Sequence, residues 1–219
     1  MALTAQERAS TIKVILFDVD GVFTDGTIWL VPGAAHGGLL DKIKSNDSKD
    51  TSLGVQSDIL MEVKGYGAHD GMGISLAKLA GLKCGIITKR ISETVATRAR
   101  DLKLEYIYQG QAFKMKPIEE ICAKESIGLD EICYVGDDII DLPVMRRCGF
   151  AVAVANARPN VKAEAHYVTP NRGGYGGARD AIEFILEAKG ILDKCVEDYL
   201  DEGKSIAPSM DLSASGGPR

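Results

Sequence analysis

Two aspartates that stand one residue apart, Asp18 and Asp20, directly follow an apolar run in this chain. The apolar residues of the run are Ile12, Val14, Ile15, Leu16 and Phe17, without polar alternation, which is typical of a parallel strand covered on both faces. Ligands of open parallel sheets bind beyond the carboxyl ends of the strands, and Gly21 lets the backbone turn sharply there. Because two adjacent carboxylates repel each other unless a cation is present, the pair predicts an oxygen-seeking metal ion such as Mg²⁺. The alternative is an acidic turn or a helix cap without a catalytic role.

Three later apolar runs also carry polar residues at or just beyond their ends. They are residues 83–88, which end in Thr88, residues 105–110, which precede Lys114, and residues 131–141, which contain Asp137, Asp138 and Asp141. Since the carboxyl ends of parallel strands meet at one edge of a sheet, these side chains are predicted to lie close together.

The four runs, in this order, resemble the four motifs of the haloacid dehalogenase-like (HAD) hydrolases. The resemblance implies an α/β fold: a three-layer, Rossmann-like HAD core with a mostly parallel sheet, a β-hairpin insertion and no separate cap domain. It also implies Mg²⁺-dependent hydrolysis of a phosphate monoester. That reaction needs an in-line nucleophile, an acid for the leaving group and positive charge near the phosphoryl oxygens.

The resemblance assigns a role to each aspartate. Asp18 matches the nucleophile that forms an aspartyl phosphate, and Asp20 matches the acid that protonates the leaving alkoxide and then activates the hydrolytic water. Asp18, the backbone carbonyl of Asp20, and Asp137 match the Mg²⁺ ligands. Asp138 and Asp141 are expected to hold metal-bound waters or to orient the family's lysine, although Asp138 could equally cap the following helix.

Thr88 and Lys114 match the family's phosphate-binding residues. The Thr88 hydroxyl and neighbouring backbone N–H groups are expected to hold a phosphoryl oxygen, and Lys114 to neutralise the phosphate and the nucleophile. The alternatives are that Thr88 simply ends a strand and that Lys114 is an exposed lysine at the start of a helix.

Five segments resemble more specifically the HAD phosphatases of 3-deoxy-D-manno-octulosonate 8-phosphate and of nine-carbon keto acid 9-phosphates. They are FDVDGVFTDG, HDGMGI, YQGQ, YVGDDIIDLPVM and GGYGGARD. The implied partner is a small phosphorylated sugar acid, either the eight-carbon acid of lipopolysaccharide precursor synthesis or, alternatively, a nine-carbon acid or another sugar phosphate. The candidates for substrate binding are Thr88, Arg90, Lys64, His69 and Arg179.

Three departures from that pattern concern the substrate more than the chemistry. Lys89 stands where the family usually has a glycine, and His69 stands where an arginine is expected. Residues 32–58 form an insertion that has no counterpart in the compact pattern. His69 and Arg179 also have ordinary alternatives, as an incidental loop histidine and a solvated residue in the first turn of a helix.

Strand-like and helix-like segments alternate over residues 1–200, which predicts one domain with right-handed crossovers. Further strands are predicted at residues 150–155 and 166–168. Helices are predicted from Asp70 to Gly81, from Ser92 to about Leu102, from near Pro117, and over residues 178–189.

Residues 27–66 are predicted to form a hairpin, with strands at residues 27–31 and 59–66 and a long polar insertion, partly helical near residues 39–43, between them. No segment has enough apolar periodicity to build a cap domain. Because water must then be excluded by a neighbouring subunit or a large substrate, we expect a homo-oligomer, with a tetramer favoured. Residues 201–219 are rich in Ser, Gly and Pro and are predicted to form a flexible tail.

The composition fits a cytoplasmic enzyme. The 219 residues include 26 Lys and Arg against 31 Asp and Glu, so the net charge of −5 offers no basic surface for nucleic acid. Five scattered cysteines without CxxC spacing are typical of reduced thiols. No apolar run reaches the roughly 20 residues that cross a bilayer, so no membrane partner is expected.

Two other classes of protein share some of these features. A response-regulator receiver domain also has an acidic metal site, a threonine and a lysine, but its phosphorylated aspartate lies on a later strand than here. A non-catalytic HAD-fold binding or scaffold protein would keep the fold without turnover. Mg²⁺-dependent hydrolysis of an aryl phosphate would separate the enzyme from both.

Overall fold

The structure, a computed structural model, describes residues 3–32 and 60–201. Within these residues six strands form a parallel sheet in the order β5-β4-β1-β6-β7-β8. The strands are β1 (Val14–Phe17), β4 (Lys83–Ile87), β5 (Tyr106–Tyr108), β6 (Ile132–Gly136), β7 (Phe150–Ala153) and β8 (Tyr167–Val168). The predicted α/β fold is confirmed, and each of the four motif runs forms a strand of this sheet.

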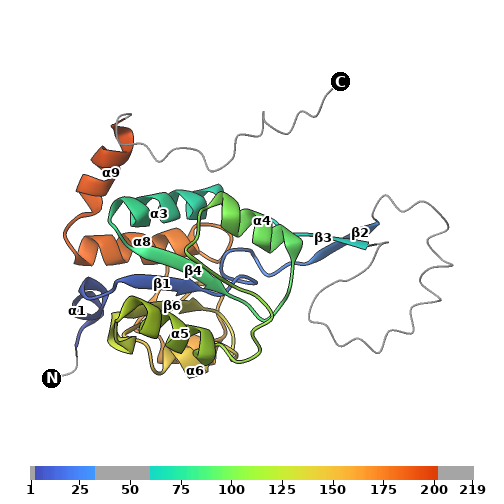
Figure 1. The fold of residues 1–219 in the computed structure, drawn as a ribbon, viewed down its shortest axis with the longest axis horizontal. Coiled ribbons are helices and arrows are strands. Elements are labelled where there is room, and N and C mark those ends of the chain that lie inside the picture. Colours follow the sequence, from blue (N-terminus) through green and yellow to red (C-terminus); the bar gives the residue numbers. More distant parts are fainter. Residues whose placement is uncertain (1–2, 33–59, 202–219) are drawn as a thin grey trace.

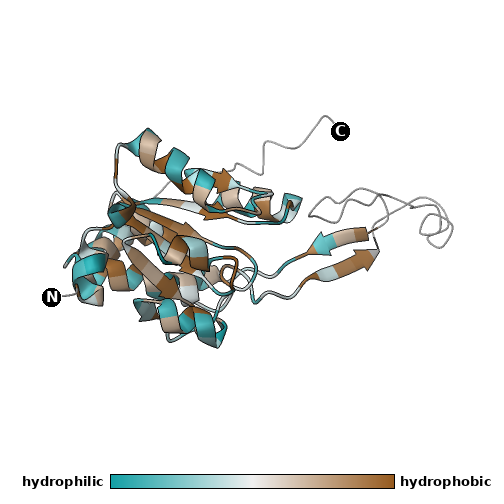
Figure 2. Cartoon of the chain, turned by 90° about the horizontal axis from the view of Figure 1, so that it is seen from below, coloured by the Kyte–Doolittle hydropathy of each residue, from teal (hydrophilic) through white to brown (hydrophobic). Residues whose placement is uncertain are grey.

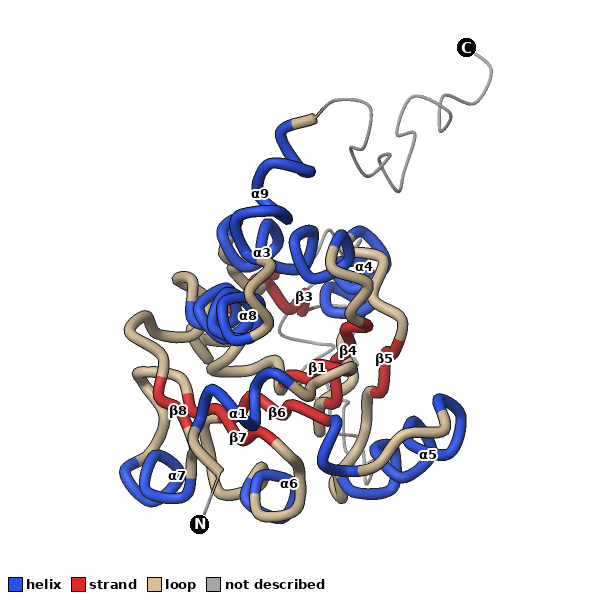
Figure 3. The backbone as a smooth tube through the Cα atoms, turned by 90° about the vertical axis from the view of Figure 1, so that its left-hand side faces the viewer, coloured by secondary structure: helices blue, strands red, loops and turns tan. Residues whose placement is uncertain are grey.

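Helices cover both faces of the sheet (Figures 1 and 3). Helices α3 and α8 pack against each other on one face, while α5, α6 and α7 lie on the other. The helices are α1 (Ala5–Ser10), α3 (Ala68–Leu79), α4 (Glu93–Asp101), α5 (Met115–Glu125), α6 (Leu142–Met145), α7 (Pro159–Glu164), α8 (Gly177–Ala188) and α9 (Leu192–Leu200). The four predicted helices form as α3, α4, α5 and α8. Helices α1, α6, α7 and α9 were not predicted. Three of these, α1, α6 and α7, have only 4 to 6 residues, too few to show a helical repeat.

The sheet topology brings the motif residues together. Strand β1 lies between β4 and β6, and Phe17 is in register with Ile86 on one side and Val135 on the other. Every residue of β1 and β6 is buried, as expected for parallel strands with helices on both faces. The loops that follow β1, β4 and β6 therefore begin at the same level, at the carboxyl edge of the sheet.

The late glycine-rich loop packs directly on the loop that follows β1. The side chain of Asn156 donates to the carbonyl of Gly21 at 2.9 Å and accepts from the N–H of Gly173 at 2.6 Å. A Cβ at Gly173 would lie 1.8 Å from the Gly21 carbonyl oxygen, so only glycine permits this approach. Loops that are about 150 residues apart in the chain are thus held as one unit.

Helix α8 is capped by an aspartate from α3. The buried carboxylate of Asp70 accepts from the backbone N–H groups of Gly176, Ala178 and Arg179 at 3.0 to 3.2 Å. These groups belong to the first turn of α8, where backbone N–H groups lack helical partners. The HDGMGI segment therefore joins the two helices that pack on one face of the sheet.

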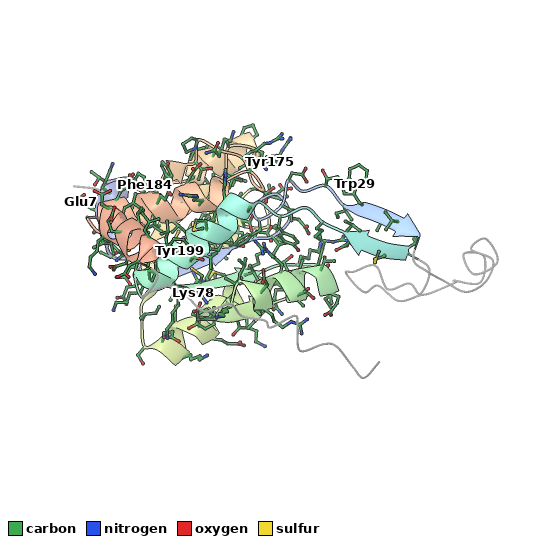
Figure 4. All side chains as sticks on the ribbon, turned by 90° about the horizontal axis from the view of Figure 1, so that it is seen from above. Glu7, Trp29, Lys78, Tyr175, Phe184 and Tyr199 are labelled. Atoms are coloured by element: carbon green, nitrogen blue, oxygen red, sulfur yellow. The ribbon has the colours of Figure 1, made fainter. Side chains whose placement is uncertain are left out.

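The predicted hairpin forms and projects from the core (Figures 1 and 2). Its strands are β2 (Trp29–Pro32) and β3 (Leu60–Val63), which pair antiparallel. Apolar side chains on both strands are exposed, with Trp29 62% and Met61 54% accessible, and Figure 4 shows Trp29 directed away from the rest of the molecule.

Two predicted features fall largely outside the described residues: the insertion at residues 32–58 with its helical stretch, and the tail at residues 201–219. In the part of the chain that is described, no separate cap domain accompanies the sheet. No helix there is long and apolar enough to cross a bilayer. All five cysteines are free thiols, and all but Cys122 are buried.

Candidate active site

The carboxylate of Asp141 is fully buried and accepts hydrogen bonds from four donors. Its Oδ1 accepts from Lys114 Nζ at 2.7 Å and from the Tyr134 hydroxyl at 2.8 Å. Its Oδ2 accepts from the backbone N–H groups of Asp137 at 2.9 Å and Asp138 at 3.2 Å. A buried charge is tolerated only when it is paired and hydrogen-bonded. Asp141 therefore holds both Lys114 and the turn that follows β6.

Lys114 lies between two carboxylates. Its Nζ is 2.8 Å from Asp18 Oδ1 and 2.7 Å from Asp141 Oδ1, and its side chain is fully buried. Burial alone would lower the pKa of Lys114, but the charges of Asp18 and Asp141 outweigh that effect and raise it. Lys114 stands at the start of helix α5, as the alternative of an exposed helix-start lysine also required. It is nevertheless a buried ammonium directed at the first-motif aspartate.

Asp18, Asp137 and Asp141 form an acidic cluster in which one oxygen of each lies within 4.8 Å of the others. Burial, with the charge of Asp141 adding to it, raises the pKa of Asp18 to about 7 although Lys114 acts in the opposite direction. Burial and the charges of Asp18, Asp141 and Asp138 raise the pKa of Asp137 to about 8. Lys114 supplies one positive charge to three carboxylates, so ionisation of all three requires a further cation.

Asp137 provides a specific test of whether a metal ion fits. Its Oδ1 is buried and has no hydrogen-bond partner in the structure, whereas both oxygens of Asp141 are fully engaged. A Cβ at Gly21 would lie 2.1 Å from Asp137 Oδ2, so glycine leaves space beside that carboxylate. An unpartnered, buried carboxylate oxygen next to Asp18 is the donor that a hard divalent cation requires.

The carboxylate of Asp20 faces two cations. Its Oδ1 contacts Lys64 Nζ, and its Oδ2 lies 3.8 Å from Arg90 Nε. Glu62 lies on the far side of the same cations, with Oε1 3.5 Å from Lys64 Nζ and Oε2 2.8 Å from Arg90 Nη2. Burial alone would raise the pKa of Glu62, but hydrogen bonds from Ser92 and Arg90 and the charges of Lys64 and Arg90 lower it. The two aspartates of the first motif therefore have different surroundings: Asp18 lies among carboxylates and beside Lys114, and Asp20 lies between two cations.

These groups open into a cavity of about 350 Å³. Its lining consists of Asp18, Asp20, Thr88, Lys89, Arg90, Lys114, Asp137, Asp138 and Ile140. Thr88 is buried at the end of β4, and its hydroxyl oxygen accepts from the N–H of Arg90 at 3.3 Å. Lys89 is exposed at the cavity and forms no ion pair with the described residues. Four strand ends therefore deliver carboxylates, a hydroxyl and cations to one cavity.

The other predicted site residues lie in different places. Lys64 is buried behind Asp20, outside the described cavity lining. His69 is exposed in the first turn of α3, and Arg179 donates to Glu183 of its own helix at 2.6 Å; neither lines the cavity. Asp138 lines the cavity and accepts from the backbone N–H of Ile139 at 2.7 Å. Of the two aspartates expected to orient Lys114, it is Asp141 that contacts its ammonium.

Three residues that the structure places in or beside the site had no role assigned from the sequence: Glu62, Lys89 and Tyr134. Glu62 lies on β3 and Lys64 directly follows the strand; residues two positions apart in extended chain point to the same side, so the sequence could have indicated this pair. Lys89 was visible as a departure from the family's glycine. No sequence pattern marks Tyr134 as a site residue, because it lies inside an apolar strand.

The chain resembles known phosphatases over most of its length. It is 33% identical over 187 residues to the 3-deoxy-D-manno-octulosonate 8-phosphate phosphatase KdsC of Escherichia coli K12, and the match covers 85% of this chain and 86% of the relative. A family profile described as haloacid dehalogenase-like hydrolase matches residues 82–181. The chain belongs to the HAD-like hydrolases.

Two solved structures of HAD-like phosphatases share this fold. The 3-deoxy-D-manno-octulosonate 8-phosphate phosphatase of Yersinia pestis superposes with a TM-score of 0.71 at 33% identity, covering 86% of this chain and 88% of that one. The enzyme of Moraxella catarrhalis, solved with magnesium, phosphate and KDO (3-deoxy-D-manno-octulosonate), gives 0.73 at 29% identity, covering 89% and 97%. This HAD-like hydrolase is a phosphatase, as the sequence predicted.

Mg²⁺ is the cofactor of this HAD-like phosphatase, consistent with the magnesium in the Moraxella structure and with the acidic cluster here. The carboxylates of Asp18 and Asp137 would hold the ion. When bound, it supplies positive charge that offsets the carboxylates and the phosphoryl oxygens. The unpartnered oxygen of Asp137 would gain the partner that it lacks among the described residues.

The raised pKa values make Mg²⁺ binding depend on pH. Asp18 and Asp137 have folded-state pKa values of about 7 and 8, against 3.8 ordinarily, so between about pH 4 and 8 the metal-free fold holds more protons than the unfolded chain. Their contribution to stability is therefore lost as the pH rises through that window. Mg²⁺ needs the ionised carboxylates, so its stabilisation should grow with pH. Each tenfold gain in affinity is about 1.4 kcal/mol, or about 3–6 °C in melting temperature for a chain of this size.

The measurement is the melting temperature with Mg²⁺ and with chelator at pH 5.5, 7 and 8.5. We expect the Mg²⁺-induced shift to increase across the series and to vanish in Asp137→Asn. Equal shifts at all three pH values would contradict the assignment of these carboxylates to the metal.

Proposed function

We propose that this phosphatase hydrolyses 3-deoxy-D-manno-octulosonate 8-phosphate through an aspartyl-phosphate intermediate. One observation carries the chemistry: the Asp18 carboxylate lies 2.8 Å from the buried Lys114 ammonium, in a cavity that Asp20 and Asp137 also line. The substrate is supported by the 33% identity to KdsC and by the KDO in the Moraxella structure.

In the first half-reaction, Asp18 attacks phosphorus in line with the departing oxygen. A bond forms between a carboxylate oxygen and phosphorus while the bond from phosphorus to the sugar oxygen breaks, and Asp20 gives its proton to that oxygen. In the second half-reaction, Asp20 takes a proton from water, which attacks the aspartyl phosphate and releases inorganic phosphate and the Asp18 carboxylate.

Lys114 and Thr88 bind the phosphoryl group in this proposal. The Lys114 ammonium, held by Asp141, lies beside the nucleophile and adds positive charge next to the phosphoryl oxygens. The Thr88 hydroxyl oxygen accepts from the Arg90 N–H, and its own proton is left to donate to a phosphoryl oxygen. Asp141 acts through Lys114 and does not touch the substrate.

The sugar end of the substrate meets Lys89 and Arg90. Both line the cavity beyond the phosphate-binding residues, and Arg90 is already paired with Glu62. Lys89 is a cavity cation that no described carboxylate neutralises. A substrate carboxylate would supply that missing charge.

The decisive experiment measures phosphate release, with Mg²⁺ and with chelator, from 3-deoxy-D-manno-octulosonate 8-phosphate, nine-carbon keto acid 9-phosphates and hexose phosphates. We expect the eight-carbon acid to be preferred and the activity to require Mg²⁺. Asp18→Asn should lower kcat at least about 10³-fold because the amide cannot attack phosphorus, while circular dichroism shows the fold retained. Preference for a nine-carbon acid would change the substrate, and no release from any compound would favour the non-catalytic alternative.

A second variant tests the recognition of the carboxylate. Lys89→Ala should raise KM for the sugar acid phosphate about tenfold, which corresponds to the loss of one charge-assisted hydrogen bond of about 1.5 kcal/mol. KM for a hexose phosphate, which has no carboxylate, should stay within about twofold. Equal changes for the two substrates would remove Lys89 from this role.

We further propose that the hairpin mediates a homo-oligomer, with a tetramer favoured, and that the enzyme works in the cytoplasm. The exposed side chains of Trp29, Leu30 and Met61 give the projecting hairpin an apolar surface of the kind that interfaces bury. The free, largely buried cysteines fit a reducing compartment.

Light scattering tests this assembly. The wild-type protein should elute at several times its 23.5 kDa chain mass, and the double variant Trp29→Ser, Met61→Ser should shift to a smaller species because the apolar contact is lost. A fully active wild-type monomer would contradict the proposal.

A further inference from the structure

Four charged side chains beside the cavity form a closed ring of alternating sign. The ring runs from Asp20 to Lys64, then to Glu62 at 3.5 Å, to Arg90 at 2.8 Å, and back to Asp20 at 3.8 Å. With Asp20 ionised the net charge of the ring is zero; with Asp20 protonated, as donation to the leaving group requires, Glu62 is the only anion among the four. The ring joins the loop after β1, the hairpin strand β3 and the loop after β4.

The two hairpin residues of the ring, Lys64 and Glu62, lie outside the lining of the cavity. The side chain of Lys64 has no accessible surface and that of Glu62 is 8% exposed. Neither is among the described residues that line the cavity, whereas Asp20 and Arg90 are. Lys64 and Glu62 are therefore placed to act on Asp20 and Arg90 from outside the cavity.

Glu62 makes the arrangement of the two cations stable. Lys64 and Arg90 both approach Asp20, so their like charges repel each other unless an anion lies between them. Glu62 occupies that position and contacts both cations. Without its charge the ring would carry a net positive charge in either state of Asp20, and no anion of the ring would hold Lys64 and Arg90 while Asp20 is protonated. The carboxyl group of Asp20 would then be drawn toward whichever cation moved.

We propose that Glu62 is a positioning residue that sets the carboxyl group of Asp20 for proton transfer to the leaving group. This inference rests on the role of Asp20 given under the proposed function. Glu62 reaches Asp20 through Lys64 and Arg90. The base of the hairpin thereby contributes to the orientation of the acid, which is attached to the core sheet.

The test compares two aryl phosphates of similar shape that differ in how much the departing oxygen needs a proton. Phenyl phosphate releases a basic phenolate, whereas 4-nitrophenyl phosphate releases a stabilised anion that needs little protonation. The quantity compared is kcat/KM, which covers the steps up to release of the aryl group. Neither compound has a carboxylate, so recognition of a sugar acid does not enter the comparison.

Glu62→Gln keeps the shape of the side chain and removes its charge. We expect kcat/KM for phenyl phosphate to fall at least about tenfold, part of the 10²- to 10⁴-fold that a general acid typically contributes, and that for 4-nitrophenyl phosphate to fall less than about threefold. Equal losses on both substrates would mean a general structural or phosphate-binding role and would overturn the proposal. The absence of any loss would overturn it as well.

Glu93→Gln is the matched control, because Glu93 pairs with Arg100 at the same 2.8 Å on an exposed face of α4. It should leave both substrates unchanged. Asp20→Asn distinguishes a failure of the proposed role of Asp20 from a failure of the inference about Glu62. If Asp20→Asn loses kcat/KM equally on phenyl phosphate and 4-nitrophenyl phosphate, the proposed role of Asp20 fails. If Asp20→Asn loses more on phenyl phosphate and Glu62→Gln does not, only the inference about Glu62 fails. Should Glu62→Gln not fold, the ratio of kcat/KM for phenyl phosphate to that for 4-nitrophenyl phosphate is measured in Glu62→Asp. The shorter side chain keeps the charge but holds it farther from the two cations. A ratio equal to that of the wild-type protein would overturn the proposal.

Discussion

The buried carboxylate of Asp141 is the interaction on which the rest of the site depends. It satisfies a lysine, a tyrosine hydroxyl and two backbone N–H groups at once, so its own desolvation is offset by four hydrogen bonds. In return it orders the turn that carries Asp137 and places Lys114 beside Asp18. Removal of one partner from such a network leaves the others buried without compensation. The geometry of nucleophile, lysine and metal-binding carboxylate is therefore a single unit.

The two ends of the site come from different parts of the fold. The phosphate end is assembled from loops at the carboxyl edge of the parallel sheet, where β1, β4 and β6 are in register. The leaving-group end receives charges from β3, which lies outside that sheet. This division places Asp18 among carboxylates that favour a cation, and Asp20 among cations that hold it in one orientation. Two aspartates one residue apart thereby take on different chemistry through their surroundings, as paired carboxylates of enzymes commonly do.

The sequence predicted the motif strands and the long helices well, because each has a readable apolar pattern and a polar residue at its end. Asp18, Asp20, Thr88, Lys114 and Asp137 were all predicted, and all line one cavity. Prediction was weaker for long cationic side chains. Lys64, Arg90 and Arg179 were equivalent candidates in the sequence, yet Lys64 is buried on Asp20, Arg90 lines the cavity, and Arg179 binds Glu183 on its own helix. Position along the chain does not reveal which carboxylate a flexible side chain will reach.

The sequence by itself determined the family, the sheet and the order of the chemical groups along its edge, because apolar runs that end in particular polar residues are local features. Tertiary structure alone decided which groups meet. The pairing of Lys64 with Asp20 joins residues 44 positions apart, and the contact of Asn156 with Gly21 spans 135 positions. Only the packed arrangement of strands, hairpin and loops brings such residues within bonding distance. Burial strengthens such contacts, since the side chain of Lys64 has no accessible surface where it meets Asp20 and its charge is little screened.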